Sequence, residues 1–401
     1  MQKLLAATTF ILCLTTGLFA QDNEIADNQW DKTSAPALAT TRQLQFSMAA
    51  KDYSDARTIR VQLPRGYDAG TQNYPVMYVL DADWNFPVVA SYIDFLAFWG
   101  RIPETIVVGI DNLNRNSDFV SPADRNFPLS GNQDRFLNFV KTELKPSIES
   151  RYRTSGFDTI FGHSFGGVAA LAFLFNTPGL FDAHIAIGTS TWVADRNSFE
   201  IAERYFKAEE KPKAFLYLSH AEFDGGDTVP ANFEFWALLK RKNPAWLDIN
   251  VSEIAETNHF TAVVPSLFEA MEAIYPANEI IEQLRHRLIT RGGSELTSWA
   301  QETTDKYGPR FHPQLMELGI MAITLAAKGH TEGATALADW LIKRNANDAQ
   351  AYAFAAQTYL TVGEREKAKT LLDEAIRIAK ETGYFPNQRR MYQRFRQQIG
   401  G

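Results

Sequence analysis

The stretch that decides the fold of this chain is Thr159-Ile160-Phe161-Gly162-His163-Ser164-Phe165-Gly166-Gly167, which contains the pattern G-x-S-x-G. Apolar residues lead into it, and the helix-forming run 168–174 leads out of it. A strand, a sharp turn and a helix form the context of a nucleophile elbow, which exposes a serine hydroxyl at the end of a strand. Glycines flank such a turn because a Cβ there would collide with the neighbouring strand and helix. Ser164 is therefore the predicted nucleophile, and a glycine-rich turn without a catalytic role is the alternative.

Several other runs are continuously apolar, and helical stretches lie between them. Continuous apolar runs are typical of parallel strands buried on both faces of a sheet, whereas alternating runs are typical of half-solvated antiparallel edges. The alternation of strands and helices predicts an α/β fold with a mostly parallel, doubly wound sheet. The buried strands are expected at 75–80, 105–110, 159–161, 183–188 and 214–218, a last strand at 248–254, the edge strands at 43–48 and 57–63, and the helices at 88–99, 133–150, 168–176 and 231–242.

His259 is the predicted general base, because a serine hydroxyl needs a neighbouring base to become a nucleophile at neutral pH. It follows the last expected strand and lies downstream of Ser164, as the chain order nucleophile, acid, histidine requires in this architecture. His220 is the rival base, since it lies close to the region expected to supply the acid. His184 lies in an apolar strand and is expected in the core, and His286, His312 and His330 belong to the C-terminal helices.

The acid that orients the imidazole should follow the strand that ends near residue 218. Glu222, Asp224 and Asp227 all qualify by position. Glu222 ranks first because it is nearest to the strand end, and Asp224 ranks second. A dyad of Ser164 and His259 without a firm acid is left open.

The oxyanion of an acyl-transfer reaction needs two backbone donors. One is predicted to be the N–H of Phe165, and the second that of Asp83 or Trp84, in the loop after the strand 75–80. The candidates for substrate binding near the strand ends are Trp84, Arg115 and Trp192. No metal site is predicted, because two aspartates in one loop have no further ligand set such as H-E-x-x-H beside them.

Composition excludes some classes of partner. The 401 residues carry a net charge of −7 without a Lys/Arg tract, which argues against nucleic acid. Residues 1–20 have a lysine near the start and an apolar run, as in a secretory signal peptide, and residues 21–40 read as a flexible lead-in. An uncleaved N-terminal anchor is the alternative, and no other apolar run is long enough to span a bilayer. The signal segment predicts a periplasmic or secreted protein. Because the one cysteine, Cys13, lies in that segment, we expect the mature chain to have no disulfides.

After residue 276 the alternation of strands and helices ends, and helical stretches follow. We expect the catalytic domain at 41–276, a linker with a helix at 277–312 and a helical domain at 313–401. The run 329–337 matches 363–371 at an offset of 34 residues, the tetratricopeptide period. Two such repeats are predicted, at 315–346 and 348–380, and two ordinary helical hairpins are the alternative. We expect this region to pack against the catalytic domain, or to mediate a protein contact or homodimer.

With these residues placed, residues 43–275 resemble the putative-esterase family of α/β-hydrolases, which includes esterase D and siderophore esterases. The motifs that carry the resemblance are Tyr78-Val79-Leu80-Asp81, Val107 to Asn112 with Arg115 and Asp118, Gly162 to Gly167, and Asn258-His259-Phe260. The resemblance implies an α/β-hydrolase fold, with Ser164 as nucleophile, His259 as base and an acid near Glu222. Leu218-Ser219-His220-Ala221-Glu222 lacks the glycine that the siderophore-esterase branch often has before this acid.

These observations predict a secreted or periplasmic serine ester hydrolase that acts on a small-molecule ester without a cofactor. Two alternatives stay open at this point. One is an acyltransferase that uses the same residues, and the other is an inert hydrolase scaffold whose helical repeats bind a protein.

Overall fold

The structure is a computed structural model, and it describes residues 42–65, 67–68, 71–207, 211–310, 315–382 and 386–399. The expected signal peptide, the lead-in and His312 lie outside the described residues. The chain divides into two compact units, an α/β unit that ends at Tyr275 and a helical unit that begins at Pro276. No helix of the described part is both long enough and apolar enough to cross a membrane.

The α/β unit contains one eight-stranded sheet with the strand order β1-β2-β4-β3-β5-β6-β7-β8. β1 and β2 pair antiparallel, β2 pairs antiparallel with β4, and all other neighbours are parallel. This confirms the predicted, mostly parallel sheet with an antiparallel edge. The strands are β1 Arg42–Met48, β2 Arg57–Leu63, β3 Tyr74–Leu80, β4 Ile106–Ile110, β5 Thr154–His163, β6 Ala183–Ile187, β7 Ala214–Phe223 and β8 Leu247–Asn258.

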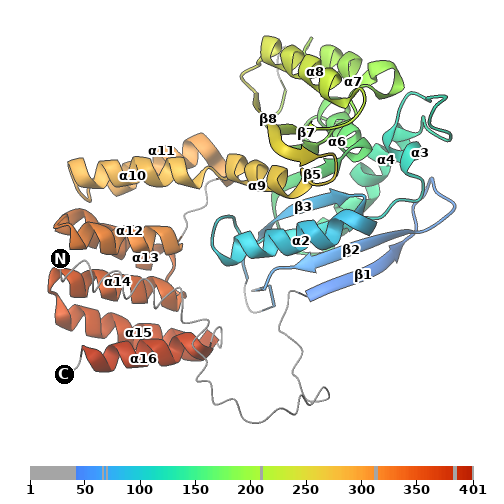
Figure 1. Cartoon of the computed structure of the whole chain (residues 1–401). Coiled ribbons are helices and arrows are strands. Elements are labelled where there is room, and N and C mark those ends of the chain that lie inside the picture. The colour runs from blue at the N-terminus through green and yellow to red at the C-terminus, as the bar shows by residue number, and fades with distance from the viewer. Residues whose placement is uncertain are drawn as a thin grey trace. The chain divides into compact units, whose positions relative to one another are not determined.

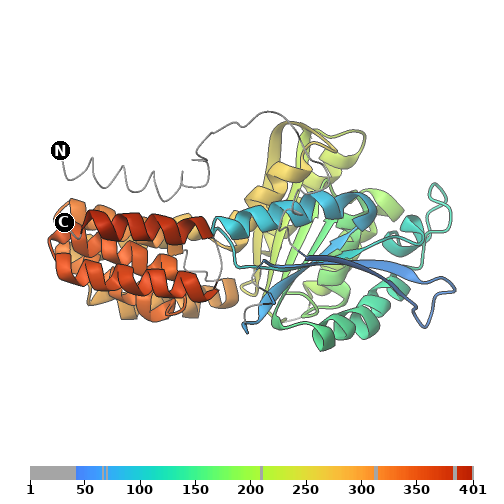
Figure 2. The same cartoon turned by 90° about the horizontal axis from the view of Figure 1, so that it is seen from below.

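Helices cover both faces of the sheet (Figures 1 and 2). α2 and α9 pack on one face, and α4 to α8 pack on the other, so the central strands are buried on both sides. α3, α7 and α9 were not among the helices expected from the sequence. The helices of this unit are α2 Ala82–Phe98, α3 Arg115–Phe119, α4 Gln133–Phe139, the π-helix η1 Val140–Leu144, α5 Lys145–Arg151, α6 Phe165–Asn176, α7 Val193–Tyr205, α8 Thr228–Lys242 and α9 Val263–Ile274.

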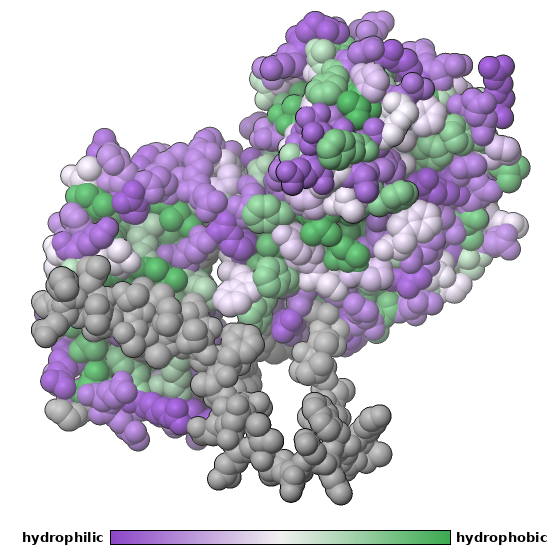
Figure 3. All heavy atoms as spheres, in the orientation of Figure 1, coloured by the Kyte–Doolittle hydropathy of each residue, from purple (hydrophilic) through white to green (hydrophobic). Residues whose placement is uncertain are grey.

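The outer side of α2 is partly apolar. Val88 and Phe95 are exposed there, and apolar side chains gather over α2 on the face that Figure 3 shows. The helix begins at the carboxyl end of β3, next to the sheet edge that carries the candidate catalytic residues. The first turn of α2 therefore contains Asp83 and Trp84, the two residues predicted to provide the second oxyanion donor.

The helical unit consists of helices stacked in chain order, with a shared apolar core for α10 to α13 and another for α13 to α16. α12 and α14 begin 34 residues apart, as do α13 and α15, so the two predicted hairpins are present at the predicted offset. Residues 277–310, expected as a linker with one helix, instead form α10 and α11 and share the core of α12 and α13. The elements are α10 Ala277–Arg291, α11 Glu295–Tyr307, the 3₁₀ turn η2 Gly308–Arg310, α12 Leu315–Ala327, α13 Thr331–Arg344, α14 Ala349–Val362, α15 Arg365–Thr382 and α16 Pro386–Gln398.

Candidate active site

Ser164 occupies a sharp turn between β5 and α6, with φ 61° and ψ −117°. Positive φ in a residue other than glycine costs about 1–3 kcal/mol, and the surrounding structure must hold it in place. The Ser164 amide donates to the carbonyl of Ile187 on β6 at 2.9 Å. A Cβ on Gly162 would lie 2.0 Å from the carbonyl oxygen of Gly166, and one on Gly167 would lie 2.5 Å from Oγ1 of Thr189. The glycines therefore allow β5 and α6 to meet closely enough to form the elbow.

The amide of Phe165 is the first of α6, and within the described residues its N–H has no hydrogen-bond acceptor. The positive end of the helix dipole adds to its attraction for an anion. Of the two residues predicted to supply the second donor, Trp84 uses its amide in a bond to the carbonyl of Asp81 at 3.2 Å. The amide of Asp83, in the first turn of α2, makes no such bond within the described chain. The geometry thus favours Phe165 and Asp83.

His259 follows β8, and its Nδ1 lies 2.7 Å from Oδ1 of Asp224. The Asp224 side chain is 2% exposed, whereas that of His259 is 24% exposed, so the contact is largely shielded from water. A carboxylate beside Nδ1 holds the proton on that nitrogen and leaves Nε2 as an acceptor. The carboxylate that reaches His259 is Asp224, not Glu222, which ranked first from the sequence.

Glu222 bonds to the main chain of β8 instead. Its Oε2 accepts the amide of Glu256 at 2.8 Å. Glu256 has φ 56°, a strained value that this contact helps to hold. Strand pairing explains why the first choice from the sequence was displaced: Glu222 still belongs to β7, and the chain leaves the strand only at Asp224.

The imidazole of His259 lies beside the elbow. A Cβ on Gly188, which follows β6, would be 3.3 Å from both Nδ1 and Cε1 of His259. The rings of His163 and His259 are 4.6 Å apart. Ser164 Oγ lies 3.5 Å from Ser190 Oγ, and no hydrogen bond joins it to His259 in this structure. In ligand-free structures, catalytic hydrogen bonds are often long and tighten only when substrate binds.

Arg115, predicted to bind substrate, forms an ion pair with the buried carboxylate of Asp81. Its Nε and one terminal nitrogen lie 2.8 and 3.0 Å from the two oxygens of Asp81, and the same terminal nitrogen donates to the carbonyl of His163. Burial raises the pKa of Asp81, although the hydrogen bonds and charge of Arg115 act in the opposite direction. Asp81 is fully buried at the start of α2. This pair therefore joins the loop of α2 to the elbow, and Arg115 keeps only part of its surface for a ligand.

Aromatic side chains line the surroundings of the nucleophile. The rings of Phe127 and Phe165 are 4.8 Å apart, and Trp192 packs 5.9 Å from Phe127. The predicted substrate-binding residue Trp84 is 50% exposed, with the Arg115 guanidinium 5.5 Å from its ring. The Arg115 guanidinium also lies 5.0 Å from the ring of Phe165, so Arg115 connects Trp84 to the aromatic cluster next to Ser164.

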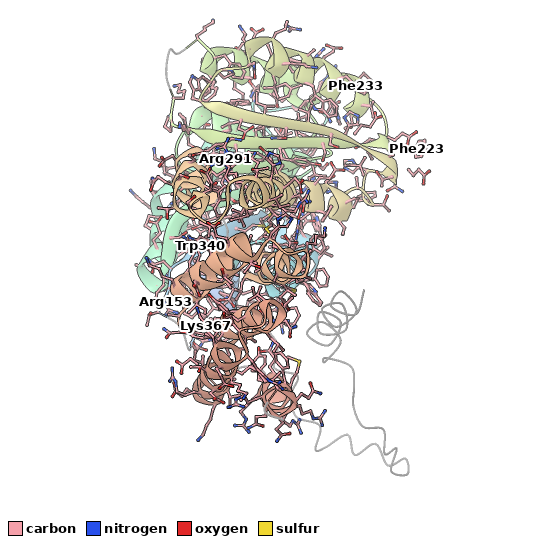
Figure 4. All side chains as sticks on the ribbon, turned by 90° about the vertical axis from the view of Figure 1, so that its left-hand side faces the viewer. Arg153, Phe223, Phe233, Arg291, Trp340 and Lys367 are labelled. Atoms are coloured by element: carbon pink, nitrogen blue, oxygen red, sulfur yellow. The ribbon has the colours of Figure 1, made fainter. Side chains whose placement is uncertain are left out.

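Two more rings flank the acid and the base. Phe223 precedes Asp224 and pairs with Asn258 on β8, and Phe260 follows His259 with its ring 5.2 Å from the imidazole. Phe223 and Phe260 are 65% and 77% exposed. Figure 4 shows Phe223 projecting at the end of the strand pair, with Phe233 further along on α8. Exposed apolar side chains that lie close together commonly mark a surface that contacts a ligand or partner.

The rival histidines lie elsewhere. His220 is buried, stacks on Trp236 with ring centroids 4.5 Å apart, and its Nε2 lies 3.2 Å from Oε2 of Glu253. His184 is buried within β6, and desolvation lowers its pKa to about 3. Neither contacts Ser164. The described residues contain no group of three His, Cys, Asp or Glu side chains that could hold a metal ion.

Two polar residues of the site had no assigned role in the sequence analysis. One is His163, whose Nε2 lies 2.8 Å from the carbonyl oxygen of His259. The other is Ser190, whose hydroxyl lies 3.5 Å from that of Ser164. The adjacency of His163 to Ser164 was visible in the sequence, but its partner lies 96 residues away along the chain.

Known proteins are similar to this chain in sequence and in fold. The family model described as Putative esterase matches residues 51–217. Ferri-bacillibactin esterase BesA of Bacillus subtilis (strain 168) is 32% identical over 137 residues, which cover 28% of this chain and 46% of that protein. Siderophore triacetylfusarinine C esterase of Aspergillus fumigatus is 24% identical over 217 residues, covering 49% of this chain and 68% of that protein. The match to BesA thus spans about half of that relative's length.

Among solved structures, an IroE-like serine hydrolase from Shewanella oneidensis has a TM-score of 0.61 at 23% identity. The match covers 74% of this chain and 98% of that one. At this level of identity the likeness concerns the fold, which confirms the α/β-hydrolase architecture. The family match lies entirely within residues 40–275 and includes the elbow. The α/β unit of this chain is therefore similar to the Putative esterase family over residues 51–217.

Proposed function

We propose that this chain is a serine carboxylic-ester hydrolase, with Ser164 as nucleophile, His259 as general base and Asp224 as the acid that orients it. The observation that carries the proposal is the 2.7 Å contact between Asp224 and Nδ1 of His259, beside a serine held on a strained elbow. Nucleophile, base and orienting acid in this arrangement perform acyl transfer on several unrelated folds.

In the first half-reaction, Ser164 Oγ attacks the ester carbonyl while Nε2 of His259 takes its proton. The carbonyl oxygen becomes an oxyanion and receives the N–H groups of Phe165 and Asp83. The C–O bond to the alcohol then breaks, and His259 returns the proton to the leaving oxygen. The products of this step are the free alcohol and an ester of Ser164.

In the second half-reaction, water takes the place of the alcohol. His259 removes a proton from the water as its oxygen attacks the acyl carbon, and the same two amides receive the oxyanion. Collapse of this intermediate breaks the bond to Ser164 Oγ, which regains its proton from His259. The acid product leaves, and the enzyme returns to its starting state.

The substrate is proposed to be a small-molecule ester. The curated relatives are named for siderophores, so a ferri-siderophore ester is the first class to test beside simple aryl and short-chain acyl esters. The aromatic wall of Phe127, Phe165 and Trp192 suits an apolar or aryl group next to the scissile bond.

The test compares wild type and Ser164→Ala on p-nitrophenyl butyrate and on a panel of siderophore esters. We expect kcat to fall by at least about 10³-fold, since loss of a triad member removes most of the rate enhancement. The matched control is Ser150→Ala, which should keep wild-type activity. Ser150 is an exposed serine on α5, and its hydroxyl donates to the carbonyl of Ser147 in the same helix.

Labelling with a fluorophosphonate, mapped by mass spectrometry, gives an independent readout. We expect one modified residue, Ser164, in wild type and none in Ser164→Ala. Equal hydrolysis by the two proteins, or labelling at another serine, would overturn the assignment.

Export and assembly are further proposals. The apolar segment at residues 4–20 supports export to the periplasm or beyond, which the mature N-terminus of protein from fractionated cells would test. The 34-residue offset of the hairpins in the helical unit supports a tetratricopeptide-like unit that contacts a protein or a second copy of the chain. Light scattering on the purified chain would show whether it pairs.

A further inference from the structure

His163 makes a contact that the proposed mechanism has not used. It is the last residue of β5, it is bonded directly to Ser164, and its side chain is 4% exposed. Its Nε2 lies 2.8 Å from the main-chain oxygen of His259. A carbonyl oxygen can only accept, so Nε2 carries a proton and donates it.

The state of His163 suits this donor role. Burial, and then the neighbouring charge of His259, lower the pKa of His163 to about 4, so the ring is neutral at physiological pH. A neutral imidazole has one N–H, and here it points to His259. A neutral ring also avoids placing a second positive charge beside His259 when that residue takes the proton of Ser164.

The other hydrogen bonds of the segment 256–262 do not fix its position relative to the nucleophile. Asn258 Oδ1 accepts the amides of Phe260 and Thr261, which shapes the turn internally. The remaining bonds in the described residues run to β7 and to Asp224 just after it, to Ile254 of β8, to Ser266 of α9 or within the segment. The bond from His163 reaches this segment from β5, the strand that carries the elbow.

The space for the contact is provided by a glycine. Gly188 has φ 53°, and a Cβ there would lie 3.4 Å from Cδ2 of His163 and 3.3 Å from the ring of His259. His259 is thus held at two points, with Asp224 on its side chain and His163 on its main chain. Because His163 and Ser164 are consecutive in the chain, the bond from His163 positions the main chain of His259 relative to the nucleophile.

We infer that His163 is a positioning residue, which ties the base-bearing segment 256–262 to the elbow through its Nε2–H and so sets the approach of His259 to Ser164. This inference rests on the proposed function. It acts through position alone: a misplacement of about 1 Å can cost on the order of 10²-fold in rate.

The experiment compares His163→Gln with His163→Asn. Both side chains are neutral amides, but only glutamine is long enough to place an N–H near the position of Nε2. We expect His163→Gln to keep kcat on p-nitrophenyl butyrate within about 5-fold of wild type, and His163→Asn to lose about 10- to 100-fold. KM should change less than about 3-fold in both, since the residue does not contact substrate. His184→Gln, the other buried histidine of the central strands, is the control and should leave kcat unchanged.

A second readout does not depend on turnover. Amide hydrogen exchange, followed by mass spectrometry, should be faster in peptides covering 256–262 in His163→Asn than in wild type or His163→Gln. Circular dichroism shows whether each variant folds. If His163→Asn does not fold, His163→Met takes its place, since it also lacks the donor and has the same expected outcome.

The outcomes separate the two proposals. Equal kcat and equal exchange in the Gln and Asn variants would overturn the positioning role even if wild type hydrolyses esters through Ser164. Hydrolysis by wild type that does not depend on Ser164 would overturn the proposed function. The difference in amide exchange between the variants would then still show whether the bond from His163 holds the segment 256–262.

Discussion

The hydrogen bond between His259 Nδ1 and Asp224 Oδ1 selects one tautomer of the imidazole and leaves Nε2 free to accept a proton. Asp224 is buried, and its second oxygen has no partner within the described residues. A buried carboxylate with an unused acceptor gains strongly from a neighbouring imidazolium, which forms when Ser164 loses its proton. The stabilisation of the imidazolium of His259 is therefore expected to depend on Asp224.

Replacement of the two candidate acids distinguishes their roles. Asp224→Asn should lower kcat by about 10²- to 10⁴-fold, because an amide permits the wrong tautomer of His259. Glu222→Gln is the matched control, since its amide oxygen can still accept the amide of Glu256, and it should stay within about 5-fold of wild type. Steady-state kinetics on p-nitrophenyl butyrate measure both. A loss in Glu222→Gln as large as in Asp224→Asn would contradict the assignment.

At the scale of elements, the site depends on the junction of β5 with α6. Nearly every residue of α6 is buried, so the helix is held in place from all sides and cannot shift to relieve a clash at its start. Its first turn is fixed against β5 by Gly162 and against the loop after β6 by Gly167. The rigid junction is what keeps Ser164 in a conformation that would otherwise be unfavourable.

A single methyl group at this junction should destabilise the α/β unit. Gly162→Ala places a Cβ 2.0 Å from a backbone oxygen of α6, and we expect a loss of at least about 2 kcal/mol in the free energy of unfolding. Gly225→Ala, where nothing lies within 4 Å of the added Cβ, should change it by less than about 0.5 kcal/mol. Denaturant unfolding followed by circular dichroism measures both, and equal midpoints would show that the junction can relax.

At the scale of the whole molecule, the α/β unit contains two buried histidines with lowered pKa values, His163 at about 4 and His184 at about 3. The unfolded chain binds protons at these residues near pH 6.5, whereas the folded chain does not. Stability therefore falls as the pH drops below about 6.5, and it is fully restored above that value.

Removing one of the two should weaken this pH dependence. Between pH 7.5 and 5.0, each buried histidine is expected to reduce the free energy of unfolding by about 2 kcal/mol. In His184→Leu, the decrease in the free energy of unfolding between pH 7.5 and 5.0 should be smaller by about 2 kcal/mol than in wild type, whatever the change in stability at pH 7.5. Denaturant titrations at the two pH values provide the comparison. An unchanged drop would mean that His184 is protonated in the folded state.

Local patterns were enough to predict much of this protein. Burial on both faces of a parallel sheet requires continuous apolar runs, so the strands could be recognised from the sequence, and the turn between residues 159 and 168 could be recognised from its glycines. The repeat of 34 residues placed α12 to α15 in the same way, because each hairpin repeats the same local requirements. Residues 277–310 carry no such repeat, and their place in the helical core became visible only through their contacts.

The sequence alone thus determined the sheet, the elbow at Ser164 and the region in which a histidine and a carboxylate had to follow. Only the tertiary structure decided that Asp224 rather than Glu222 meets His259, that Arg115 pairs with Asp81, and that His163 reaches the main chain of His259. The physical reason is that hydrophobic patterning acts over whole elements and tolerates small shifts. A hydrogen bond joins atoms from distant parts of the chain and is made or lost within a fraction of an ångström.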